Sequence, residues 1–176
     1  VMADVVLEYI DAQNVITPTL QNRINPANAP KISAIADQST AEEVTAGPFQ
    51  FTISDVETNA NTLVLTGTSS NTALVSNANI GFGGSGITRT VTLTPTTDMV
   101  GTTTISIDVF DGTYTTRETF VLTVNNINDA PTVVGIADQT LMVGQASEAL
   151  ALTVGDIDND VATLTVTATS SNTNLV

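Results

Sequence analysis

Residues 104–124 read Thr-Ile-Ser-Ile-Asp-Val-Phe-Asp-Gly-Thr-Tyr-Thr-Thr-Arg-Glu-Thr-Phe-Val-Leu-Thr-Val, and this stretch decides the fold. Ile105, Ile107 and Val109 alternate with polar residues, which is the pattern of a strand that buries one face. Asp111-Gly112 is a hairpin-turn signal. Beyond the turn the alternation resumes, at Phe120, Leu122 and Val124. The stretch therefore predicts two antiparallel strands that bury the same face of a sheet.

The same period of two recurs through residues 29–129, with frequent turn signals between β-branched and aromatic positions. The further predicted strands lie at Ile32 to Ala36, Phe49 to Ile53, Leu63 to Leu65, Leu74-Val75 with Ile80 to Phe82, and Val91 to Leu93. No stretch has a helical period. We therefore expect an all-β, seven-stranded Greek-key sandwich.

An internal repeat sets the domain organisation. Four segments recur at an offset of 101 residues without a gap: Ala29-Pro30 at Ala130-Pro131, Ile35 to Gln38 at Ile136 to Gln139, Asp55 at Asp156, and Thr68 to Thr72 at Thr169 to Thr173. A period of this size is that of a whole sandwich and too long for a solenoid repeat. The sequence predicts tandem sandwiches, of which the second is incomplete.

Three segments follow from this repeat. Residues 1–28 lie outside it and are predicted to form a strand segment and linker, with strands at Val5 to Ile10 and Val15 to Leu20. Residues 29–129 form the complete sandwich, and residues 130–176 form the first part of a second one. We expect the rest of the second domain to follow Val176. The alternative is that a neighbouring subunit covers the open sheet by β-strand addition, which would build a filament.

Composition excludes several chemistries. Cys and His are absent, so thiol nucleophiles, Ser-His-Asp relays, disulfides and the usual zinc sites are ruled out. The net charge of −14 would repel nucleic acid. Apolar runs are far shorter than the roughly 20 residues of a membrane-spanning helix, so we expect no membrane insertion. The natural counter-ion is a hard cation such as calcium.

The junction between the copies resembles a known family. Thr119 to Val124, the following Asn125-Asn-Ile-Asn-Asp-Ala-Pro131 and the upstream Asp108-Val-Phe-Asp-Gly112 are similar to the bacterial immunoglobulin-like and cadherin-like repeats of large surface adhesins. The resemblance covers roughly residues 29–176. It implies an extracellular, bacterial cell-surface protein made of sandwiches joined end to end, often with calcium at the joints.

The resemblance also implies a set of calcium ligands. Asn126-Ile-Asn128-Asp129 matches the cadherin linker and Asp156-Ile-Asp158 matches the cadherin turn, while Asn126 and Ala130 depart from the family pattern and favour one or two ions over three. The candidate metal ligands are Asn128, Asp129, Asp156, Asp158, Asp160, Asp98 and Glu43, with Glu42 as an alternative to Glu43. The competing interpretation is that these side chains only cap turns.

The sequence leaves three functions open. The first is a structural spacer of an adhesin or surface filament, whose partners are neighbouring domains of the same chain or neighbouring subunits. The second is a module that recognises glycan or protein, but sugar platforms use exposed aromatic residues, and the chain has no Trp and only Tyr114 as a loop tyrosine. An enzyme is the least favoured, so we expect none. The spacer is the prediction that the sequence supports best.

Overall fold

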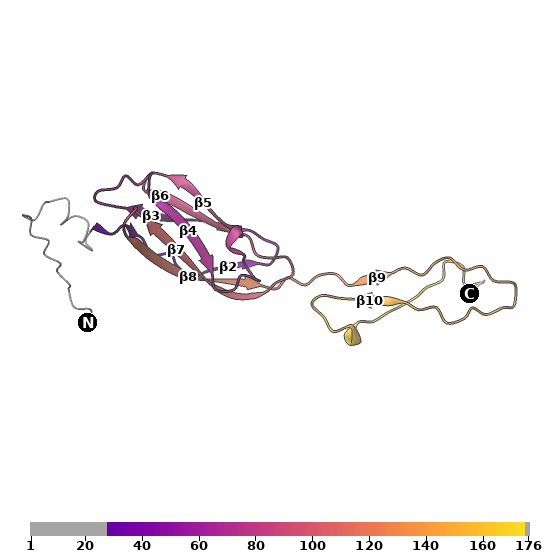
Figure 1. Cartoon of the computed structure of the whole chain (residues 1–176). Coiled ribbons are helices and arrows are strands. Elements are labelled where there is room, and N and C mark those ends of the chain that lie inside the picture. The colour runs from indigo at the N-terminus through magenta and orange to yellow at the C-terminus, as the bar shows by residue number, and fades with distance from the viewer. Residues whose placement is uncertain (1–27, 175–176) are drawn as a thin grey trace, which may run out of the picture. The chain divides into compact units, whose positions relative to one another are not determined.

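The computed structural model describes residues 28–174 (Figure 1). The predicted strands at Val5 to Ile10 and Val15 to Leu20 lie outside the described residues. The chain divides into two units between Asn126 and Ile127, within the predicted linker.

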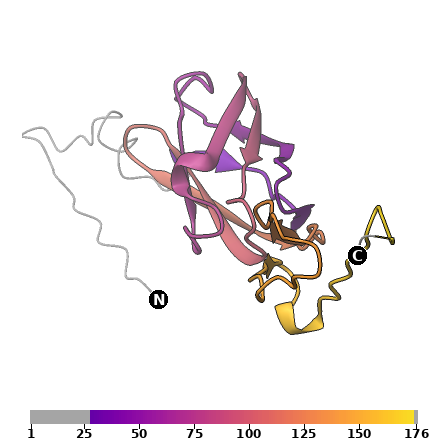
Figure 2. The same cartoon turned by 90° about the vertical axis from the view of Figure 1, so that its right-hand side faces the viewer.

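The first unit is a sandwich of two four-stranded sheets (Figure 1 and Figure 2). One sheet has the order β1-β3-β6-β5 and the other has the order β2-β8-β7-β4. Every strand pair is antiparallel except β2 with β8. The elements in chain order are β1 (Lys31–Ile32), β2 (Gln38–Ala41), β3 (Ala46–Ser54), β4 (Val64–Ser69), η2 (Asn77–Asn79), β5 (Ile80–Ser85), β6 (Thr88–Leu93), β7 (Gly101–Phe110) and β8 (Thr115–Asn125). The predicted all-β sandwich is confirmed.

The core lies between the two sheets, where the alternating apolar positions meet. Ile105, Ile107 and Val109 of β7 have no exposed surface, and Phe120, Leu122 and Val124 of β8 are nearly as buried. Phe49 packs edge-on against Phe120 with 6.4 Å between the ring centroids. The other buried apolar residues are Ile35, Ala46, Phe51, Ile53, Leu63, Leu74, Val75, Ile80, Val91 and Leu93. Burial of this apolar face is the main stabilising term of the sandwich.

Of the predicted first strand, Ile32 to Ala36, only Ile32 lies in a strand, and the chain passes from one sheet to the other through residues 33–37. β1 pairs with β3 in one sheet, whereas β2 lies parallel to β8 in the other. Between them the Asp37 carboxylate accepts a hydrogen bond from the backbone N–H of Val121 at 2.7 Å. This bond holds the chain beside β8 just before β2 begins, so the first strand is shorter than predicted and β2 follows it outside the predicted bounds.

Leu74 and Val75 do not belong to the short middle strand, which is β5 alone. Both residues are fully buried, but their backbone N–H groups donate to the Asn71 carbonyl in a turn. Their side chains therefore fill the core from a loop, a role that an apolar pair cannot reveal by its sequence period.

The predicted hairpin at Asp111-Gly112 joins β7 to β8. The Asp111 carboxylate accepts hydrogen bonds from the N–H groups of Thr113 (2.6 Å) and Tyr114 (2.7 Å). Gly112 has a φ of 104°, a left-handed conformation that favours glycine. The turn chemistry of the sequence is confirmed here.

The second unit repeats the first in its strand register. Its elements are β9 (Thr132–Val134), β10 (Thr153–Gly155) and η3 (Val161–Thr163). Thr132 pairs with Gly155 and Val133 with Val154. In the first unit Lys31 pairs with Ser54 and Ile32 with Ile53, so each pair recurs 101 residues later. The repeat of the sequence is therefore a repeat of structure.

The apolar face of the second unit is open. Leu152 is 39% exposed, whereas Phe51, its counterpart in the first unit, is 2% exposed. Val133, Val154, Leu164 and Val166 line a hollow on this face. In the first unit the corresponding residues lie in or against one core, to which β6, β7 and β8 contribute buried residues. Residues 127–174 contain counterparts of β1 and β3 without counterparts of β6, β7 or β8.

Two isoleucines test how much of the stability comes from this core. We expect Ile107→Ala to lower the free energy of unfolding of the first unit by about 3 kcal/mol, because it removes buried methyl groups and leaves a cavity. Ile87→Ala, at a side chain that is 61% exposed, should change it by less than about 0.5 kcal/mol. Urea unfolding followed by far-ultraviolet circular dichroism measures both. Equal losses for the two variants would contradict this assignment of the core.

Candidate functional site

The loop after β10 is organised by one carboxylate. Asp156 Oδ1 accepts hydrogen bonds from the backbone N–H groups of Asp158 (2.9 Å) and Asn159 (2.8 Å) and from the Asn159 side-chain amide (3.1 Å). Such Asx turns form where a short polar side chain reaches the backbone two or three residues further on. The turn fixes the positions of the acidic residues that follow β10.

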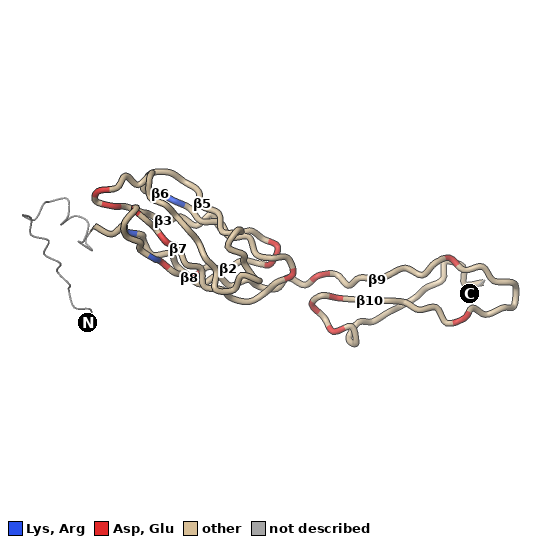
Figure 3. The backbone as a smooth tube through the Cα atoms, viewed as in Figure 1, with Lys and Arg blue, Asp and Glu red and all other residues tan. Residues whose placement is uncertain are grey.

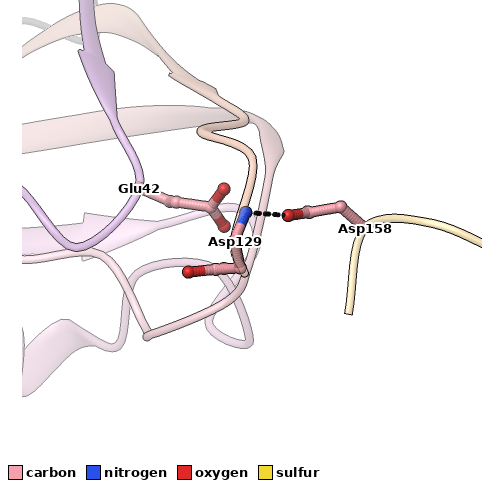
Figure 4. Close-up of side chains that lie close together, drawn as sticks. All are labelled: Glu42, Asp129 and Asp158. Carbon is pink, nitrogen blue, oxygen red and sulfur yellow. Dashed lines mark hydrogen bonds between the residues drawn. The ribbon is translucent and has the colours of Figure 1, made fainter. Parts of the chain in front are cut away.

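The linker residues of the second unit are bonded to this loop. The Asp158 carboxylate accepts a hydrogen bond from the Asp129 N–H at 2.5 Å (Figure 4). Asn159 donates from its side chain to Asn128 Oδ1 at 3.1 Å. Four of the predicted metal ligands, at 128, 129, 156 and 158, therefore belong to one hydrogen-bonded network within the second unit. Asn159 completes that network.

The network is strongly acidic. Figure 3 shows the Asp and Glu positions in red at the linker and in the loop after β10, and no blue position lies in the second unit. Residues 127–176 contain no Lys or Arg. Asp129, Asp156 and Asp158 are each half-buried. Carboxylate and amide oxygens in an irregular loop are the ligands that calcium takes in proteins.

The pKa of Asp156 lies below its usual value. Desolvation raises this pKa, but the hydrogen bonds from the backbone of Asn159 and Asp158 and from the Asn159 side chain together lower it by more. Hydrogen bonds of this kind favour the ionised carboxylate. Asp156 is therefore held in the charged form that favours binding of a cation.

Asp160 has a structural role. Its carboxylate accepts a hydrogen bond from the Ala162 N–H at 2.9 Å and caps η3. In the first unit Asn59, the counterpart of Asp160, accepts the equivalent bond from Asn61. Because the cap recurs in a copy with an amide at this place, a carboxylate at Asp160 is not needed for the turn.

The remaining predicted ligands, Asp98 and Glu43, lie in the first unit. Both side chains are exposed and both backbones have positive φ, 58° and 61° respectively. Glu42, also labelled in Figure 4, has a buried side chain, and its N–H donates to the Asn125 carbonyl at 2.9 Å. Of the two adjacent acids, the structure buries Glu42 and leaves Glu43 exposed.

The Asx turn itself also occurs in the first unit. Asp55 Oδ1 accepts from the N–H groups of Glu57 (2.9 Å) and Thr58 (2.6 Å), as Asp156 does at the corresponding positions. The turn is therefore part of the repeating fold. What distinguishes the second unit is an Asn in place of Thr58, together with Asn128 and Asp129 where the first copy has Ala27 and Asn28.

Another charged cluster in the first unit is an ion pair. Arg117 on β8 donates two hydrogen bonds of 2.7 Å to the two carboxylate oxygens of Asp108 on β7. The hydrogen bond from Arg117 and then its charge lower the pKa of Asp108 below its usual value, against the effect of burial. The pair lies across neighbouring strands and has the geometry of a structural contact.

Among the described residues, no helix is both long and apolar enough to span a membrane.

No family model matches the sequence, and neither does any curated protein. The solved structures that are similar include domains of titin and of an S-layer protein. The titin domains Z1Z2 in complex with telethonin match with a TM-score of 0.42 and 17% identity over 61% of this chain and 53% of that one. Domains 4 and 5 of the S-layer protein SbsC match with a TM-score of 0.38 and 25% identity over 54% of this chain and 53% of that one.

This chain therefore spans about half the length of the titin chain that it matches. The class of fold follows from the strand order of the first unit. In an immunoglobulin-like sandwich one sheet contains the first, second, fifth and fourth strands, and here these are β1, β3, β6 and β5. The other sheet contains the third, sixth and seventh strands, which here are β4, β7 and β8. The first unit is an immunoglobulin-like β-sandwich.

The titration of Asp156 tests the network in the loop. We expect its carboxyl pKa, measured from the ¹³C shift against pH, to lie below the free value of about 3.9. Because the folded-state pKa is the lower one, the turn has its full stability above about pH 3.9 and loses it as the pH falls through the folded-state pKa. Asn159→Ala should raise this pKa, whereas Gln139→Ala, outside the network, should leave it unchanged. A wild-type pKa at or above the free value would contradict the network.

Proposed function

We propose that the chain is a spacer repeat of an extracellular bacterial surface protein, an adhesin or filament whose sandwiches provide reach. The observation that carries this proposal is the path of the chain through the first unit. The Pro30 carbonyl accepts a hydrogen bond of 2.5 Å from the Thr116 hydroxyl, at the start of β8. The chain leaves this unit after Asn126, just beyond the other end of β8.

The two ends of the sandwich are therefore separated by the length of β8. This strand has 11 residues, and at about 3.3 Å per residue it spans roughly 35 Å. A domain whose chain enters at one end and leaves at the other adds its full length to a tandem array. The 101-residue repeat, with its conserved register in β9 and β10, supports such an array.

Calcium bound at the linker and loop of the second unit is the second part of the proposal. Asn128, Asp129, Asp156 and Asp158 would supply the oxygen ligands, and the absence of Lys and Arg from residues 127–176 leaves their charge to be balanced by a cation. The ion would hold the linker against the loop after β10 and so limit bending of the chain at the linker. The participation of Asp98 and Glu43 stays a prediction.

The surface location is proposed from composition. An acidic chain without Cys suits an environment in which the domain must remain soluble and independent of redox state. These properties support a cell exterior without identifying a receptor.

Calcium titration tests the metal site with a matched control inside the same chain. We expect the amide signals of residues 128–129 and 156–159 to shift on addition of Ca²⁺, with a dissociation constant of about 10⁻⁴ to 10⁻³ M. The double variant D156N/D158N should abolish the shifts. The variant D55N/E57Q, which changes the equivalent loop of the first unit, should retain them. No shift up to about 10 mM Ca²⁺, or equal shifts at 55–58, would refute the site.

Immunogold electron microscopy tests the spacer. Antibodies raised against the chain should label intact cells of the source organism, with gold particles away from the outer boundary of the cell envelope. Lysis should add little signal. Labelling that appears only after lysis would overturn the surface location, and labelling confined to the envelope would overturn the role in reach.

A further inference from the structure

The sandwich of the first unit has four sheet edges, and they differ in their protection. β1 and β5 are the edges of one sheet, and β2 and β4 are the edges of the other. An open edge presents unpaired backbone donors and acceptors, so soluble proteins shorten, charge, twist or cap their edges. Three of the four edges are short or capped at both ends, whereas β4 is capped only at its end, at Ser69.

The edges β1 and β2 are short and close to charges or caps. β1 has two residues and begins at Lys31. β2 has four residues and is followed directly by Glu42 and Glu43. The Thr40 carbonyl of β2 also accepts a hydrogen bond from the Asn125 side chain at 3.1 Å. Neither edge offers a long stretch of free backbone.

The edge of β5 is capped at both ends. The Ile80 N–H donates to the Asn77 carbonyl in the preceding 3₁₀ turn. At the other end, the Gly84 carbonyl accepts a hydrogen bond from Arg89 at 3.0 Å, and Gly84 has a φ of 82°. Between these caps, Phe82 is the one residue of β5 whose N–H and C=O both face outward and are both uncapped.

On the edge of β4, Leu65 and Gly67 have backbone groups that are open for pairing with another strand, and they lie two residues apart. The Ser70 N–H donates to the Thr104 carbonyl of β7, which continues the β4–β7 register. Since alternate residues of an antiparallel strand face the same neighbour, Leu65 and Gly67 direct their N–H and C=O groups away from β7. The Asn77 side chain occupies the next outward N–H, that of Ser69, at 2.9 Å.

The side chains around this open edge carry no net charge. β4 reads Val-Leu-Thr-Gly-Thr-Ser, without a charged residue or a proline. Val64, Thr66 and Thr68 form its exposed outer row. Asp108 of β7, in register with Thr66, is paired with Arg117.

We propose that β4 is a pairing edge for a second copy of this domain. The two β4 strands run antiparallel about a two-fold axis at Thr66. The Leu65 N–H and C=O then bond to the C=O and N–H of Gly67 in the second copy, and the symmetric pair makes the same two bonds. The two strands join their sheets into one sheet of eight strands.

A second copy fits because the edge is complementary to itself. The two-fold axis places Thr66 opposite Thr66, and Val64 opposite Thr68, on the outer face. β-branched pairs of this kind stabilise antiparallel strands. An acidic or basic partner strand would gain nothing from an edge that carries no charge.

A single β4 pair is weak, but an array makes it effective. Residues 28–126 contain nine acidic and three basic side chains, so two copies repel each other at low salt. If the domain occurs in tandem, as the proposed spacer requires, many edges act together at high effective concentration. The β4 pairing would align neighbouring chains side by side, and it can form between single copies even if the spacer role fails.

Sedimentation equilibrium and amide exchange on the full chain test the pairing. In 0.5 M NaCl we expect a dimer with a dissociation constant of about 10⁻⁴ to 10⁻³ M, and protection of the Leu65 and Gly67 amides that rises with protein concentration. Thr66→Lys and Thr66→Glu each place like charges opposite one another and should raise the constant about tenfold or more.

The decisive part of the experiment is to mix the two charged variants. T66K mixed with T66E should restore dimerisation, because opposite charges then face each other across the axis. Thr119→Lys, on the outer face of the interior strand β8, is the matched control and should leave the constant unchanged. Association that persists in T66K, including aggregation through the open face of the second unit, would overturn the proposal. So would a mixture that remains monomeric, or a wild-type chain that is monomeric at about 1 mM.

Discussion

The pairing of β7 with β8 is the interaction on which the rest of the structure depends. Its ladder runs from Gly101 opposite Val124 to Phe110 opposite Thr115, and it is the longest in the molecule among the described residues. One face of this ladder is the floor of the core, and its free edges receive β2 and β4. The second sheet closes over that floor because Val91, Leu93, Phe51 and Ile53 have no other apolar surface to cover. Both the path of the chain along β8 and the position of the β4 edge depend on this ladder.

The strands that alternate strictly could be predicted from the sequence, because a period of two is a local property of a half-buried strand. What failed were features set by distant contacts. The first strand ends early, and the chain is held beside β8 by a hydrogen bond between Asp37 and the backbone of Val121, 84 residues away. In the sequence, Leu74 and Val75 do not differ from other apolar pairs. Only the turn at Asn71 shows that both side chains are buried in the core from a loop.

The candidate site was predictable to a similar degree. The acids at 129, 156 and 158 stood out in the sequence, and the structure joins them with Asn128 in one network within the second unit. Asn159 was missed as a site residue, although the run Asp-Ile-Asp-Asn-Asp contains it. Its role depends on a side chain that reaches both Asp156 and Asn128, which spacing alone does not define. The first copy shows which part of the loop is architecture, since the same Asx turn forms there around Asp55.

The parallel pairing of β2 with β8 determines how the sandwich would bear tension. A pull applied at Pro30 and at Asn125 draws β2 backward and β8 forward along their common axis. The hydrogen bonds of that pair lie across the direction of pull, so they are loaded together in shear instead of opening one after another like a zip. Resistance to rupture then depends on the rate at which this patch breaks, which is a kinetic property distinct from equilibrium stability. In a tandem array of such domains, the four-residue pair of β2 with β8 would be a contact that a pull loads in shear.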